Sequence, residues 1–285
     1  MPSAKRERQR EGRVARAAAE AAARKRRQRL RGARNYGLIA VAVVVAIVVL
    51  SRGGGDKKEP VAASSNSSSS PSTSTTVAPA PFSFGNGACP NADGSSPKTI
   101  DFTDAPRECI DPSKTYTATF DTSVGKVVVK LDTQKTPGTT NNFVVLARYH
   151  YYDGTTIFRT AQSIGIVQGG GPHTNSTADP GPGYSLQDEG FDYASLSQGG
   201  QAVGGPYSYP PGALVMARTG RPNGAGAEFF FAVNDKTASL DSQGVYVTFG
   251  TTTSGLDLLA TFLDSEPAET PVHPVTINTV TIAET

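Results

Sequence analysis

Residues of the types that perform covalent chemistry are few in this chain. Its 285 residues include two cysteines, three histidines and no tryptophan. That composition argues against a multi-cysteine zinc module, an iron–sulfur protein or a disulfide-dense miniprotein. His150, His173 and His273 are scattered along the sequence, and we interpret all three as structural or surface residues. We therefore expect neither a metal site nor a cofactor.

A glycine-rich stretch and two polar residues are the remaining candidates for ligand binding. The stretch GGGPHTNSTADPGPG lacks the lysine and the strand–helix context of a phosphate-binding loop, so we exclude that function. Arg159 follows a phenylalanine on a predicted strand, and such an arginine taken alone is more often a surface charge. Gln168 precedes two glycines, a pattern that fits the start of a turn equally well.

Three consecutive phenylalanines, Phe229–Phe231, are typical of a core strand. Side chains alternate between the two faces of a strand, so we expect Phe229 and Phe231 on one face and Phe230 on the other. At least one of them therefore belongs to the core, whatever the function of the protein.

The charge distribution divides the chain into a basic tail and an acidic body. Residues 1–34 carry 13 Lys and Arg against 3 Asp and Glu, although the whole chain has a net charge of only +2. Residues 37–50, GLIAVAVVVAIVVL, form a long uninterrupted apolar run. A helix through this run would be roughly 24 Å long, slightly shorter than a bilayer core of about 30 Å. We interpret residues 35–52 as a transmembrane anchor.

The basic residues precede this anchor, so the positive-inside rule predicts a single-pass cell-membrane protein with residues 1–34 in the cytoplasm and the remainder outside. A cleaved secretory signal is an alternative, although LSRGGGDKK lacks a small-x-small cleavage site, and a buried core strand is another. The arginine cluster at 24–31 is compatible with nucleic-acid binding, but the adjacent span favours contact with anionic lipid headgroups. We expect a membrane partner and no nucleic acid.

Two segments separate the anchor from the folded body. Residues 53–81 are rich in Ser, Thr and Pro and cannot bury a core, which predicts a flexible linker. Residues 82–114 contain Cys89 and Cys109. In an oxidising environment two cysteines in one short, loop-rich segment most simply pair with each other, and two unrelated thiols are the alternative. Their disulfide would close a loop of about twenty residues and stabilise the fold by about 3 kcal/mol.

Residues 115–285 have the pattern of a mainly β domain. YTATFDT and KVVVKLDT are strand-like, with a hairpin turn at the VG of SVGK. Further strands are predicted at 156–160, 164–168, 213–217, 228–233, 246–249 and 275–282. One helix is predicted from Pro137 onward, capped by Thr139 or Thr140, and another at 255–263. Eight or so short strands with two helices suggest a closed antiparallel barrel whose ends the helices cover.

The stretches NNFVVLARYHYYDGTTIFRT, IVQGGG, PGALVMAR, EFFFAV, SLDSQGVYVTFG and VTINTVTI follow one another in this body. In order and spacing they resemble the cyclophilin-type peptidyl-prolyl isomerases over about residues 115–283. The anchor, the Ser/Thr linker and the two-cysteine segment are similar to the membrane-tethered bacterial members of that family. The resemblance implies an eight-stranded antiparallel barrel with two capping helices, which agrees with the strand count.

The resemblance also implies a site. Arg159 matches the family's catalytic arginine and Gln168 its active-site glutamine. The implied substrate-binding residues are Ile164, Ile166, Ala217, Phe230, Leu240 and Tyr246. Among them Ala217 lies on the strand whose edge is expected to pair with the substrate backbone.

Three positions depart from the family pattern. Gly165 stands where a phenylalanine is usual, with Ile164 available to fill the gap. Ser239 replaces a common tryptophan, and Arg218 replaces a common asparagine. The pocket is therefore expected to be less aromatic than usual, which bears on substrate affinity and turnover but not on the arginine.

The residue types suit a reaction in which no bond is broken. Rotation about an X-Pro amide has a barrier of about 18–20 kcal/mol because the nitrogen lone pair is delocalised. A catalyst must favour the twisted amide over both planar isomers. The guanidinium of Arg159 can donate to the prolyl nitrogen while apolar side chains hold the ring, and Gln168 can fix Arg159 or the substrate carbonyl.

Two functions follow from this interpretation. The first is a monomeric peptidyl-prolyl isomerase that acts on proline-containing segments of exported or cell-envelope proteins. The second is a catalytically weak proline-peptide binding or chaperone module, suggested by the missing aromatic residues. DNA binding through residues 1–34 is a third possibility, and it predicts strong salt sensitivity.

Overall fold

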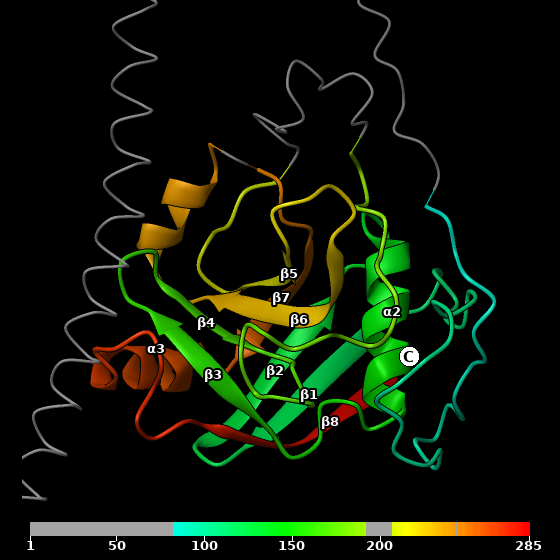
Figure 1. The fold of residues 1–285 in the computed structure, drawn as a ribbon, viewed down its shortest axis with the longest axis horizontal. Coiled ribbons are helices and arrows are strands. Elements are labelled where there is room, and N and C mark those ends of the chain that lie inside the picture. The colour runs from blue at the N-terminus through cyan, green and yellow to red at the C-terminus, as the bar shows by residue number, and fades with distance from the viewer. Residues whose placement is uncertain (1–81, 192–206, 243) are drawn as a thin grey trace, which may run out of the picture. The chain divides into compact units, whose positions relative to one another are not determined.

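The computed structural model describes residues 82–191, 207–242 and 244–285 (Figure 1). The predicted basic tail, anchor and linker lie outside these residues, so the span at 37–50 stays a prediction. Within the described residues, the helices are all too short or too polar to cross a bilayer.

Eight strands close into a barrel in which every pair of neighbours is antiparallel. The order around the barrel is β1-β2-β7-β5-β6-β4-β3-β8, which confirms the predicted closed antiparallel architecture. The strands are β1 (Tyr116–Thr122), β2 (Gly125–Leu131), β3 (Thr155–Ala161), β4 (Ile166–Gly169), β5 (Ala213–Arg218), β6 (Ala225–Ala232), β7 (Thr248–Ser254) and β8 (Thr276–Glu284).

Two apolar clusters lie on opposite faces of the strands. The larger one fills the barrel and includes Phe229 and Phe231, whereas Phe230 belongs to a smaller cluster on the outer face. The predicted alternation of the three phenylalanines is therefore confirmed. Inside the barrel, Phe120 packs edge-to-face on both Phe229 and Phe231, at ring distances of 5.4 and 5.3 Å.

Helix α2 (Pro137–Arg148) packs against β6, β7 and β8, and α3 (Leu256–Ser265) packs against β2 and β4, on opposite sides of the barrel (Figure 1). The predicted cap of α2 is wrong, because its N-cap residue is Thr136 and the side chain of that residue does not cap it. The carboxylate of Glu189 instead accepts hydrogen bonds from the backbone of Gly138 and Thr139 and from the Thr139 hydroxyl. A residue 50 positions away thus satisfies the free N–H groups of the first turn.

Several boundaries differ from the predicted ones. Strand β4 begins at Ile166, because Ile164 lies in the preceding turn, and β7 begins at Thr248, beyond Tyr246. The hairpin turn lies at Ser123 and Val124, one residue earlier than predicted, and Gly125 is already the first residue of β2. Helix α3 begins after Gly255, whose φ of 84° suits glycine, and a Cβ there would overlap the Lys126 carbonyl.

The short 3-10 helix η1 (Asp235–Leu240) was not expected from the sequence. Its last residue, Leu240, is buried in the outer apolar cluster. The side chain of Asn234 caps η1 by accepting a hydrogen bond from the backbone N–H of Lys236 at 3.2 Å. This helix therefore carries one wall residue of the site described below.

Asn141 on α2 attaches the disulfide-pinned segment, residues 82–114, to the barrel. Cys89 and Cys109 form a disulfide, which confirms the predicted pairing. The buried amide of Asn141 accepts hydrogen bonds from the backbone of Cys109 and Ile110 and donates to the carbonyl of Arg107. The disulfide and the Asn141 hydrogen bonds hold together a segment that has no helix or strand of its own in the described residues.

Candidate active site

A row of residues in register crosses the outer face of the barrel. Arg159 on β3 lies opposite Gln168 on β4, which lies opposite Phe230 on β6. Phe230 in turn lies opposite Val215 on β5. Residues directly opposite one another share a face of the sheet, so this register brings the guanidinium, the amide and the aromatic ring together.

A β-bulge places Arg159 in this row. Ile157 lies opposite Gly169 and packs in the barrel interior, and the next pair in register is Arg159 with Gln168, so Phe158 is an extra residue. Strict alternation from Ile157 would turn Arg159 inward, whereas the bulge turns it outward. The Arg159 side chain therefore points to the outer face because Phe158 is an extra residue in β3.

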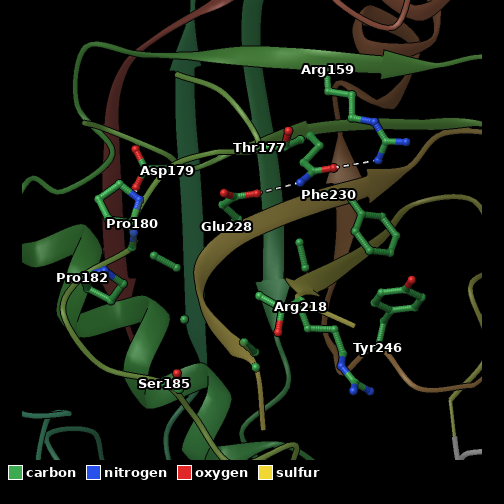
Figure 2. Close-up of a pocket in the computed structure, with 18 of the residues that line it drawn as sticks. Arg159, Thr177, Asp179, Pro180, Pro182, Ser185, Arg218, Glu228, Phe230 and Tyr246 are labelled. Carbon is green, nitrogen blue, oxygen red and sulfur yellow. Dashed lines mark hydrogen bonds between the residues drawn. The ribbon is translucent and has the colours of Figure 1, made fainter. Parts of the chain in front are cut away.

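The polar half of the site is a chain of hydrogen bonds (Figure 2). Arg159 Nη1 donates to Gln168 Oε1 at 3.0 Å, and Gln168 Nε2 donates to Glu228 Oε2 at 2.7 Å. The Arg159 Nε also lies 3.5 Å from the exposed carboxylate of Glu269. The Arg159 side chain remains 28% exposed, so its guanidinium is accessible to a substrate in the cavity.

The apolar half of the site is formed by aromatic and branched side chains from several elements. Phe230 and Tyr246 pack edge-to-face at 5.6 Å, and Leu240 from η1 and Ile166 from β4 belong to the same outer cluster. Tyr209, which sequence reasoning missed, is buried in this cluster as well. Its hydroxyl accepts from the Tyr246 N–H at 2.8 Å and donates to the Tyr246 carbonyl at 3.2 Å, which fixes that wall.

The structure brings together all eight side chains that the sequence analysis selected. They border one cavity of about 380 Å³, and they are Arg159, Ile164, Ile166, Gln168, Ala217, Phe230, Leu240 and Tyr246. Pairing of a substrate backbone with the edge of β5 stays a prediction. Strand β5 has neighbours on both sides, β6 and β7, and Ala217 lies where the register between β5 and β6 shifts.

The departures from the family pattern have different structural consequences. Ile164 borders the cavity beside Gly165, as the sequence suggested. Ser239 is exposed on η1, where its hydroxyl donates to the Lys236 carbonyl, and it is not among the residues that border this cavity. Arg218 borders the cavity with a buried side chain and lies 3.5 Å from Asp188.

Glu228 is a further residue of the site that the sequence analysis did not select. It borders the cavity, and burial raises the pKa of its carboxyl to about 7, against the lowering effects of Gln168 and Arg159. A signal was present, because Glu228 precedes Phe230 by two residues on one strand and alternation places both on the same face. Within the described residues, no group of three His, Cys, Asp or Glu could hold a metal ion.

Comparison with known proteins decides the family. Residues 117–282 match the family described as cyclophilin type peptidyl-prolyl cis-trans isomerase/CLD. The chain belongs to this family. This cyclophilin is accordingly a peptidyl-prolyl cis-trans isomerase, and the matched residues coincide with the barrel.

Bacterial relatives agree with this assignment. Over 132 residues, the cyclophilin is 36% identical to peptidyl-prolyl cis-trans isomerase B of Bacillus subtilis, covering 46% of this chain and 79% of that protein. It is 28% identical over 180 residues to the isomerase B of Escherichia coli, covering 58% of this chain and 99% of that protein. A probable isomerase B of Mycobacterium tuberculosis is 33% identical over 132 residues, which cover only 40% of its length.

Among solved structures, a cyclophilin-type isomerase of Cryptosporidium parvum aligns with 59% of this chain and 98% of its own chain. The TM-score is 0.47 and the sequence identity 24%. A second structure of that Cryptosporidium protein was obtained in the presence of the dipeptide Ala-Pro.

Proposed function

We propose that this cyclophilin accelerates X-Pro rotation through Arg159, with the outer apolar cluster holding the proline ring. Phe230, Leu240 and Ile166 offer the ring an apolar surface beside the guanidinium. Burying the ring there contributes about 1–2 kcal/mol to binding. Such weak binding allows the enzyme to accept and release many different substrates.

The proposed chemistry needs only a positioned charge. As the amide twists, delocalisation is lost and the prolyl nitrogen becomes a hydrogen-bond acceptor. The Arg159 guanidinium carries donors and no acceptor, so it stabilises this nitrogen more than it stabilises either planar amide. Gln168 accepts a hydrogen bond from Nη1 and so holds the guanidinium in one orientation before the twisted amide forms. Less conformational entropy is then lost when the guanidinium binds the twisted state.

The observation that carries this proposal is that Arg159 and Phe230 border one cavity, with Gln168 between them in register. The test compares the full chain with Arg159→Ala in a peptide isomerisation assay. Arg221→Ala is the matched control, because Arg221 is exposed on the β5–β6 loop. We expect loss of about tenfold or more in kcat/KM for Arg159→Ala only.

The same assay separates the enzyme from the weak binding module. If the wild type and Arg159→Ala both remain near the uncatalysed rate while a proline peptide still binds, the chain is a binding module. A clear difference in rate between these two proteins, with Arg221→Ala active, supports Arg159 as the catalytic residue.

We further propose that the substrates are exported or cell-envelope proteins and that residues 37–50 anchor the enzyme in the cell membrane. Support comes from the apolar run, the basic tail before it and the Cys89–Cys109 disulfide, since such bonds persist in oxidising compartments. The test is protease treatment of intact cells and the mass of the membrane-extracted protein. Digestion of the barrel with survival of a membrane-bound tail is expected, whereas a barrel protected in intact cells contradicts the topology. A mass lacking residues 1–50 contradicts the retained anchor.

A further inference from the structure

We propose that Glu228 is a positioning residue that couples isomerase activity to its own ionisation, by holding the Gln168 amide that in turn holds Arg159. This inference rests on the proposed role of Arg159. In this proposal Glu228 does not touch the twisting bond itself. Its ionisation makes the isomerase activity depend on pH, which Arg159 alone does not.

The hydrogen bonds of this chain have fixed directions. A guanidinium can only donate, and an ionised carboxylate can only accept. With Arg159 on one side and Glu228 on the other, the Gln168 amide therefore has one favourable orientation, with its oxygen toward Arg159 and its nitrogen toward Glu228. A reversed amide would place its NH2 group against the Arg159 donor.

Protonation of Glu228 weakens this arrangement. A carboxylic acid both donates and accepts, so it bonds to either end of the Gln168 amide. The bond from Gln168 Nε2, now 2.7 Å long, also loses its charge assistance, and charge-assisted hydrogen bonds are roughly twice as strong as neutral ones. The Gln168 amide then restrains the Arg159 guanidinium less. The guanidinium must lose more orientational freedom when it binds the twisted amide, so catalysis is slower.

The location of Glu228 allows its carboxyl group to change ionisation state near neutral pH. The residue is half-buried on β6, where the register with β5 shifts, and its partner Gln168 is only 6% exposed. Burial raises the pKa of Glu228 to about 7, and the negative charge of Asp179 acts in the same direction. Gln168 and Arg159 oppose this rise, so the carboxyl remains able to ionise.

Other titratable groups face Glu228 from neighbouring segments. Asp179, in the loop after β4, has a fully buried side chain that bonds to His173. Tyr151, between α2 and β3, is buried, and that burial raises its pKa, so it stays uncharged. His173 is therefore the group whose titration most needs to be distinguished from that of Glu228.

The experiment measures kcat/KM of the full chain from about pH 5.5 to about pH 8.5. The substrate is a blocked peptide containing Ala-Pro and no titratable group, and NMR exchange spectroscopy avoids a coupled protease. For the wild type we expect kcat/KM to rise by about fivefold through a single step near pH 7. Glu228→Gln is neutral and, like the protonated acid, both donates and accepts, so it should show no step and a rate near the lower plateau.

Two further variants complete the test. Glu228→Ala removes the acceptor and should give a low kcat/KM at every pH, with KM changing less than kcat. His173→Gln should retain the step. A direct titration of the Glu228 carboxyl carbon by NMR should follow the same midpoint as the activity.

The outcomes are distinct. A step that persists in Glu228→Gln, or one that disappears in His173→Gln alone, overturns the role of Glu228 while leaving Arg159 in place. Absence of a step in the wild type, with full activity throughout, overturns it equally. If instead the wild type is inactive at every pH, the proposed function itself fails, and the carboxyl titration then reports on Glu228 independently.

Discussion

Arg159 Nη1 lies 3.0 Å from Gln168 Oε1, and the two residues stand opposite each other on β3 and β4. The pair exists because Phe158 is an extra residue that turns Arg159 to the outer face. A backbone irregularity and a side-chain hydrogen bond together therefore fix the direction of the one cation that we assign to catalysis.

Replacing Gln168 should reduce activity without unfolding the barrel. In Gln168→Ala, Arg159 loses its acceptor and Glu228 loses its donor, so the guanidinium is less restrained. We expect kcat/KM to fall by about tenfold, mainly through kcat. The measurement is peptide isomerisation by NMR, with thermal unfolding as the control. An unchanged kcat/KM would contradict the positioning role of Gln168.

The barrel was predictable from the sequence because some strands, such as β1, follow a two-residue alternation, while others, such as β5, are short apolar runs. Glycine, proline and polar turns bound these segments. The three phenylalanines show how far this reasoning reaches, since alternation alone separated Phe230 from its two neighbours. The order of strands around the barrel did not follow from alternation, because pairing joins segments far apart in the chain.

Only part of the site was predictable from the residue pattern, in contrast to the barrel. Arg159 alone looked like a surface charge, and the bulge at Phe158 leaves no mark in the pattern of apolar residues. Glu189 caps α2 from 50 residues away, and Tyr209 acts through its hydroxyl on a backbone segment, so neither had a local signal. Glu228 did have one, namely its spacing from Phe230.

Tyr209→Phe should loosen the apolar wall. The Tyr209 hydroxyl bonds to both the N–H and the carbonyl oxygen of Tyr246, and Phe keeps the ring but leaves these backbone groups without that partner. We expect a loss of about 1–2 kcal/mol in the free energy of unfolding and a higher KM for proline peptides. Urea unfolding and isomerisation kinetics provide the two measurements. Wild-type stability together with wild-type KM would exclude this role.

Glu189→Ala should destabilise the fold through the first turn of α2. Its carboxylate accepts from the Gly138 and Thr139 N–H groups at 2.9 and 2.8 Å, and alanine offers them no acceptor. We expect a loss of about 1–2 kcal/mol in unfolding free energy, the range for removal of a helix cap. Glu189→Gln, which retains one acceptor oxygen, should lose less. Equal stability of Glu189→Ala and the wild type in urea would disprove the cap.

The attachment of the disulfide-pinned segment to the barrel should weaken as pH rises. His150 Nδ1 and Nε2 lie 2.8 Å from Asp153 Oδ2 and the Gly94 carbonyl, while His173 bonds to Asp179 and Asp101. Because these four partners accept hydrogen bonds, both nitrogens of each ring must donate, which requires the imidazolium form. Gly94 and Asp101 belong to the segment, so each charged ring joins it to the barrel.

The direction of the pH effect follows from the two pKa shifts. Hydrogen bonds to Asp153 and Gly94 raise the pKa of His150, and burial opposes but does not cancel the rise that Asp101 and Asp179 cause in the pKa of His173. Since the folded-state values lie above the ordinary value of 6.5, the stabilisation is complete below pH 6.5. It is lost as pH rises through the raised folded-state pKa values.

Hydrogen exchange can measure this loss locally. The backbone N–H of Thr99 donates to the Tyr149 carbonyl and that of Phe102 to the Pro182 carbonyl, so both amides report on docking of the segment. Their protection factors, corrected for intrinsic exchange, should fall as pH is raised above 6.5 in the wild type. The double variant His150→Gln, His173→Gln should show lower protection with no such fall, whereas pH-independent protection in the wild type would refute the imidazolium contacts.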